Sequence, residues 1–118
     1  MHDILRDLVQ TLSARAALTV AKDGMLVACH AAEGLDPERL GALGTGILRE
    51  LTSALAAEGW DHFRQIEVAA DRGRLVVVDA GPMYLLVLVG ARLEIGADSI
   101  DIQRAAQRIV KESGLTSA

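Results

Sequence analysis

Two adjoining apolar runs constrain the fold of this 118-residue chain more than any other feature of its sequence. Residues 75–78 read LVVV and residues 84–89 read YLLVLV, with the turn-forming Gly81 and Pro82 between them. Neither run alternates apolar with polar residues, which indicates strands that are covered on both faces. The sequence therefore predicts a sheet with helices packed above and below it.

Three shorter strands are expected before these runs. Residues 18–29 read LTVAKDGMLVAC, in which Asp23-Gly24 is typical of a two-residue hairpin turn. Such a turn sets Val20 opposite Val27. Residues 64–68 alternate polar and apolar side chains, which predicts a half-covered strand, and the short connections after it favour a meander of the last three strands.

The middle helix has the clearest boundaries in the sequence. Asp36 is a good N-cap and Pro37 fits the first helical position, while Gly59 after Glu58 is a typical C-terminal stop. The apolar residues between these limits recur at helical spacing and predict a stripe that faces the core. The stripe comprises Leu40, Gly44, Ile47, Leu51, Ala54 and Leu55.

Two further helices complete the expected fold. One covers residues 3–14, and the last begins at a cap on Asp98 or Ser99 and ends before Gly114. The prediction is an α+β fold in which a mainly antiparallel five-stranded sheet is flanked by three helices on two faces, in the order αββαβββα. The length fits a single domain over residues 1–118.

Composition argues against several classes of function. A net charge of −4 and three aromatic residues do not suit nucleic-acid binding. The long apolar run is interrupted at Asp79, Gly81 and Pro82, so we expect no membrane insertion and a soluble, cytoplasmic protein. Cys29 is the only cysteine, and the three histidines lack metal-ligand spacing. We therefore expect no catalytic residue, no metal and no cofactor, and we interpret Asp79 as a turn residue.

The glycines of the middle helix suggest close contact with a neighbour, because glycine inside a helix costs about 0.5–1 kcal/mol relative to alanine. Gly44 falls on the predicted core stripe, where the absence of a side chain would let the helix approach the sheet. A flank of mostly small residues could be approached by another helix, and we hypothesise a dimer contact there, with simple tolerance of glycine as the alternative. This flank comprises Gly41, Thr45, Leu48 and Thr52.

The strand around Ile66 offers a second dimer contact if it lies at the edge of the sheet. An edge strand exposes backbone N–H and C=O groups that a second copy can pair with. Arg64, Ile66 and Val68 would then belong to the interface. Charges at Arg64 and Glu67 could equally protect the edge from pairing.

Taken in order, these elements resemble the roadblock family, which is related to the dynein light chains. The resemblance rests on the VAKDGMLVA hairpin, the LGALGTGILRELTSAL helix, the strand ending Ile66-Glu67-Val68, the GRLVVVDAGPMYLLVLV pair and the RAAQRI helix. It covers nearly the whole chain. One departure is ARLEIGADSIDIQ, because prokaryotic members have a shorter entry to the final helix.

The resemblance implies a homodimer in which edge strands join two sheets and the second helices pack side by side. It also implies a non-catalytic scaffold or regulator of a small Ras-like GTPase, which would act on the exposed side of the paired helices. Glu38, Arg49 and Ser53 lie opposite the predicted core stripe and are our candidate partner-binding residues.

Two other readings remain open. A small-molecule sensor of the same architecture would need a cavity of roughly 300 Å³ or more with convergent polar groups, and a purely structural adaptor would need only the interaction surfaces. An enzyme is the least favoured, because the sequence offers no convergent acid, base and nucleophile.

Overall fold

The order of helices and strands agrees with the expectation. The computed structural model describes residues 1–90 and 97–117. Along the chain the elements are α1 (His2–Leu12), β1 (Ala16–Ala21), β2 (Leu26–Ala31), α2 (Pro37–Ala57), β3 (Gln65–Ala70), β4 (Gly73–Ala80), β5 (Met83–Gly90) and α3 (Ala97–Ser117). The predicted α+β class and the order αββαβββα are confirmed.

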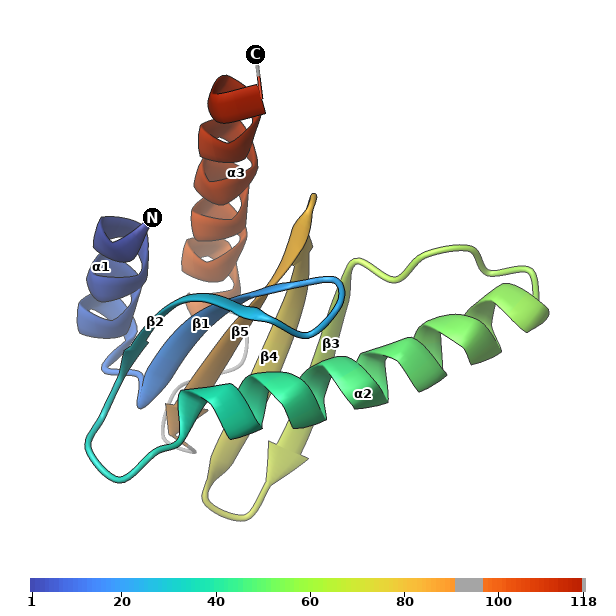
Figure 1. Ribbon diagram of the computed structural model, residues 1–118. Coiled ribbons are helices and arrows are strands. Elements are labelled where there is room, and N and C mark those ends of the chain that lie inside the picture. Colours follow the sequence, from blue (N-terminus) through green and yellow to red (C-terminus); the bar gives the residue numbers. More distant parts are fainter. Residues whose placement is uncertain (91–96, 118) are drawn as a thin grey trace.

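The five strands form one antiparallel sheet in the order β2-β1-β5-β4-β3. The last three strands form the expected meander, and β3 lies at one edge of the sheet while β2 lies at the other. Helices α1 and α3 cover one face, and α2 crosses the opposite face (Figure 1). This arrangement explains why β4 and β5 have no polar face.

Each face of the sheet has its own apolar core. On the α1 and α3 side, the largest contributions come from Leu5, Leu85, Val87, Ile102 and Ile109. On the α2 side, Leu18, Val20, Leu48, Val77 and Leu86 pack together. The two cores use alternate residues of the same strands, as the pleat requires.

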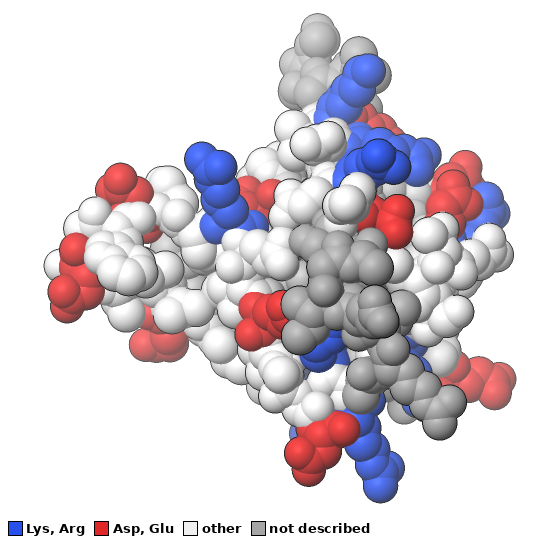
Figure 2. Space-filling model, turned by 180° about the vertical axis from the view of Figure 1, so that it is seen from behind, with Lys and Arg blue, Asp and Glu red and all other residues white. Residues whose placement is uncertain are grey.

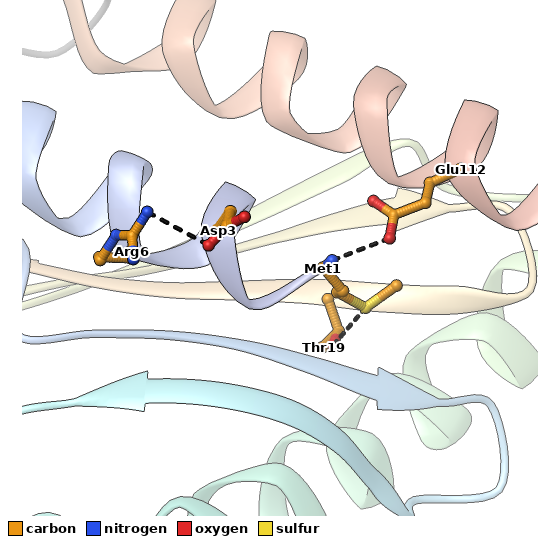
Figure 3. A network of polar contacts seen from close by, with 5 residues as sticks. All are labelled: Met1, Asp3, Arg6, Thr19 and Glu112. Atoms are coloured by element: carbon orange, nitrogen blue, oxygen red, sulfur yellow. Dashed lines mark hydrogen bonds and ion pairs between the residues drawn. The ribbon is translucent and has the colours of Figure 1, made fainter.

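Polar contacts tie the start of α1 to α3 and to the sheet (Figure 3). The amino group of Met1 lies 2.8 Å from Glu112 Oε1, and the Thr19 hydroxyl donates to Met1 Sδ at 3.2 Å. Asp3 and Arg6 form a surface ion pair at 3.2 Å on α1. These contacts help to hold the two helices side by side on one face.

The predicted register of the first hairpin is wrong. Val20 pairs with Leu26 and Thr19 with Ala28, so a β-bulge leaves Val27 without a partner on β1. The turn is also longer than two residues, because the Ala21 N–H donates to the Met25 carbonyl. Asp23 and Gly24 still form the turn, with Gly24 at φ +100°, but the bulge turns Val27 out to solvent.

The caps of α2 confirm the predicted boundaries. Asp36 accepts a hydrogen bond from the Arg39 N–H at 3.2 Å, Pro37 is the first helical residue, and Gly59 follows the helix at φ +75°. Helix α3 differs from its prediction. It begins at Ala97, so the proposed caps Asp98 and Ser99 lie within its first turn, and it continues beyond Gly114 to Ser117. The part of the departing ARLEIGADSIDIQ stretch at residues 91–96 lies outside the described residues.

Candidate protein-interaction surfaces

Helix α2 meets the sheet through its small residues. The fully buried positions of α2 are Gly41, Gly44, Thr45 and Leu48. A Cβ on Gly41 would lie 3.2 Å from Val20 Cγ2, and a Cβ on Gly44 would lie 2.9 Å from Leu86 Cδ2. The helix therefore lies so close to β1 and β5 that these two positions have almost no room for a side chain.

This placement corrects the expected dimer flank. Gly41, Thr45 and Leu48 pack against the sheet of their own chain, and Thr52 on the same side is half-buried. The Thr45 hydroxyl is occupied, because it donates to the Gly41 carbonyl at 2.8 Å. These residues do not form an exposed flank that another helix could approach.

The exposed apolar side of α2 carries Leu43 together with Ile47 and Ala54, two residues that were expected on the core stripe. Leu43 is 58% exposed and Ile47 is 64% exposed, and Ala54 is also on the surface. Gly41 lies over β1 and Gly44 over β5. With 100° per residue, Ile47 and Ala54 lie on the flank of α2 opposite to Thr45, and Leu43 lies on the side away from the sheet. We call Leu43, Ile47 and Ala54 the α2 stripe.

An open apolar groove of about 330 Å³ lies on the part of the sheet that α2 leaves uncovered. Helix α2 packs mainly against β1 and β2, and its C-terminal half extends past β3 (Figure 1). The groove is lined mostly by apolar residues, with exposed Arg15 and Arg72 beside them. Its apolar lining includes Leu35, Val68, Ala70, Leu75 and Leu88.

The β3 edge is regular and poorly covered. Residues 65–70 pair with residues 73–78 of β4 without a bulge, and Ile66 is half-buried while Val68 and Arg64 are exposed. The other edge, β2, carries the bulge at Val27. Since bulges discourage pairing along an edge, β3 is the edge better suited to a second copy.

Glu67 is engaged within the sheet. Its carboxylate forms an ion pair with Arg74, whose side chain is buried. On the same face, Gln103 of α3 donates to Gln65 at 2.7 Å. Glu67 therefore stabilises the β3–β4 pair, which weakens the alternative that this charge protects the edge.

The three candidate partner-binding residues, Glu38, Arg49 and Ser53, are all exposed. They lie on the flank of α2 that borders the β1–β2 turn, where a Cβ on Gly24 would lie 3.8 Å from Thr45 Cβ. A second open groove, of about 350 Å³, lies there and is lined by Gly24, Met25, Leu26 and Glu38.

Sequence reasoning missed Met25, which is 69% exposed. Its place directly after Asp23-Gly24 was the available signal, because an apolar residue at a hairpin turn has no core position to fill.

Asp79 performs the expected turn role. One carboxylate oxygen accepts from the Gly81 N–H at 3.0 Å, and the other lies 2.8 Å from Lys22 Nζ. The same ammonium group lies 4.0 Å from the centre of the Tyr84 ring, which stacks on Phe63. In residues 1–90 and 97–117, no three His, Cys, Asp or Glu side chains gather as metal ligands would.

Within the same described ranges, no helix has both the length and the hydrophobicity to cross a membrane.

The fold and its surfaces define a small α+β interaction domain, with an uncovered apolar helix side and a free sheet edge. The chain belongs to the Roadblock/LC7 domain family, whose model matches residues 2–89. The family resemblance is therefore confirmed.

Individual relatives agree with this assignment. The uncharacterized protein MJ1340 of Methanocaldococcus jannaschii is 28% identical over 106 residues, which cover 90% of this chain and 93% of the relative. MglB of Myxococcus xanthus has a TM-score of 0.91 at 18% identity, with 96% of this chain and 94% of that chain covered. A Roadblock/LC7 domain from Streptomyces avermitilis has a TM-score of 0.84 at 24% identity and covers 95% and 96%. At these identities the two solved structures show a shared fold.

Proposed function

We propose that this chain is a homodimeric, non-catalytic regulator or scaffold that binds a small Ras-like GTPase. Membership of the Roadblock/LC7 family supports this role, because roadblock domains act as regulators and adaptors. The observation that carries the proposal is the α2 stripe beside an apolar groove. Monomeric proteins rarely expose continuous apolar surface of this kind unless it binds something.

A second copy would fit both features at once. The α2 stripe lies on the flank of α2 away from the β1–β2 turn, and the 330 Å³ groove lies at the opposite end of the sheet from that turn, around the β3–β4 turn. In a two-fold arrangement the α2 stripe of each copy would fill the groove of the other, because the same patch serves both partners. The β3 edges would pair beside them, with Arg64, Ile66 and Val68 at the junction.

This arrangement would leave a separate surface for the GTPase. Glu38, Arg49 and Ser53 lie on the flank of α2 away from the α2 stripe. They would remain accessible in the dimer. The GTPase would therefore bind on the side of α2 that borders the β1–β2 turn.

The dimer is tested by light scattering on wild-type protein and on the double variant Leu43→Asp/Ile47→Asp. We expect a dimeric mass for the wild type and a monomeric mass for the variant, since the charges would have to be buried in the interface. Ser53→Asp, on the other flank, is the matched control and should stay dimeric. A monomeric wild type, or a dimeric double variant, would contradict the proposed contact.

The GTPase is tested with each purified Ras-like GTPase encoded beside this protein in its genome. Each is loaded with GDP or with a non-hydrolysable GTP analogue, and binding is followed by calorimetry. We expect clear preference for one nucleotide form. Equal affinity for the two nucleotide forms would contradict the regulatory role and leave the scaffold role. No binding to any of these GTPases would contradict both roles.

A ligand sensor is the second candidate, because the groove of about 330 Å³ reaches the size of small-molecule sites. Its apolar lining and the exposed Arg15 and Arg72 suit an apolar ligand with an acidic group. The dye 1-anilinonaphthalene-8-sulfonate has this chemistry. Binding to the wild-type dimer would favour the sensor, whereas binding only to folded Leu43→Asp/Ile47→Asp monomers would favour a groove filled by the second copy.

A further inference from the structure

The groove between the β1–β2 turn and α2 has an apolar anchor that the proposed dimer contact does not use. Met25 is 69% exposed and lines this groove of about 350 Å³ together with Gly24, Leu26 and Glu38. Methionine is flexible and polarizable, and it is enriched in the buried centres of protein interfaces. An exposed methionine beside an open groove is therefore suited to cover a partner's apolar side chain.

The local backbone holds this anchor in place. The Asp23 carboxylate accepts the Met25 N–H at 3.0 Å, and the Met25 carbonyl accepts the Ala21 N–H at 2.8 Å. Two residues later the β-bulge exposes Val27 on the same hairpin. Bulges often re-aim side chains beside functional sites. The hairpin thus exposes two apolar side chains, of which Met25 lines the groove.

The charged side chain among the lining residues of the groove is a carboxylate. Glu38 lines it and Asp23 lies directly beside Met25, and neither forms an ion pair within residues 1–90 and 97–117. The nearby ammonium of Lys22 is occupied by Asp79 and lies over the Tyr84 ring. A cation from outside would therefore find two available carboxylates at this groove.

A second copy bound groove to groove would place Glu38 and Asp23 against the same two carboxylates of its mate, and like charges that face each other across an interface are unfavourable. On the back of the molecule, Lys and Arg are interspersed with Asp and Glu (Figure 2). The proposed dimer contact also uses the opposite flank of α2. The observations thus favour a different protein as the occupant.

We propose that this groove is the anchor site for the partner protein, which inserts an apolar side chain against Met25 and places a neighbouring lysine or arginine beside Glu38 and Asp23. This inference rests on the proposed function, because it takes the partner protein to be the Ras-like GTPase. It adds Met25, as the apolar centre of the site, to the candidate partner-binding residues Glu38, Arg49 and Ser53.

The test measures the affinity of the GTPase, in its preferred nucleotide form, for wild-type protein, Met25→Asp and Glu38→Lys. Replacing an anchor residue of an interface typically lowers the affinity tenfold or more. We therefore expect Met25→Asp to bind the GTPase about tenfold or more weakly than the wild type. Glu38→Lys should weaken binding and reverse its response to salt, since attraction becomes repulsion. Light scattering should show an unchanged oligomeric mass for both variants.

Matched controls separate this site from general surface effects. Val110→Asp introduces the same charge at an exposed apolar residue of α3, and Glu58→Lys reverses a charge at the far end of α2. Both should bind like the wild type. If wild-type protein binds the GTPase and Met25→Asp and Met25→Ala bind equally well, the inference is wrong while the proposed function stands. If the wild type binds no GTPase, both are wrong.

Discussion

Replacing Gly44 with alanine should destabilise this protein, whereas the same replacement two residues later, at Gly46, should stabilise it. Both glycines lie inside α2. A Cβ on Gly44 would lie 2.9 Å from Leu86 Cδ2, and Leu86 is only 1% exposed, so its side chain has no free space to move into. A Cβ on Gly46 would have nothing within 4 Å.

The size of the difference follows from two opposing effects. Alanine in place of glycine inside a helix gains about 1 kcal/mol of helix propensity, and both variants share this gain. Overpacking a filled core costs about 1–3 kcal/mol, and only the Gly44 variant incurs this cost. We therefore expect Gly46→Ala to be more stable than Gly44→Ala by about 1–3 kcal/mol.

Urea unfolding followed by circular dichroism measures this difference, at one fixed protein concentration because dimer formation would make stability depend on concentration. The two variants should differ in Tm as well, by about 4 °C for each kcal/mol in a chain of this size. Equal stability of the two variants, within about 0.3 kcal/mol, would refute the close approach of α2 to β5.

Three further predictions test other parts of the structure. Asp36→Ala removes the acceptor for the Arg39 N–H and should cost about 1 kcal/mol in urea unfolding, whereas Asp36→Ser should retain most of the stability. Glu67→Ala removes the ion-pair partner of the buried Arg74 and should cost about 1–3 kcal/mol, and a neutral result would show that Arg74 does not depend on this pair. Val68→Asp should leave the stability of the protomer within about 1 kcal/mol, because this side chain is half exposed, yet it should lower the dimer mass in light scattering if β3 edges pair.

The sequence predicted the elements well because their signals are local. The caps at Asp36 and Gly59 act within one turn of α2, and the apolar runs at residues 75–78 and 84–89 identify buried strands without reference to the rest of the chain. The meander of the last three strands followed from the short connections between them, whereas the pairing of β1 with β5 was not predicted. The family resemblance depended on the same order and spacing, and the family model confirms it.

The candidate sites were predicted less well. Glu38, Arg49 and Ser53 are exposed as expected, and β3 is an edge strand, but Gly41, Thr45 and Leu48 belong to the core. Helical periodicity correctly placed Gly44 against the sheet, but it placed Ile47 and Ala54 inward and Gly41, Thr45 and Leu48 outward. It could not show that Gly41 also approaches the sheet, since that choice depends on the shape of β1 and β5.

By itself, the sequence determined which segments become helices or strands and where most of them begin and end, because hydrogen bonds and side-chain preferences over a few residues set those limits. Only the tertiary structure decided the side of α2 that packs on the sheet, the bulge that exposes Val27, and the groove that leaves Met25 uncovered. Those features depend on how closely segments distant in the chain can approach one another, and packing between them outweighs any local preference.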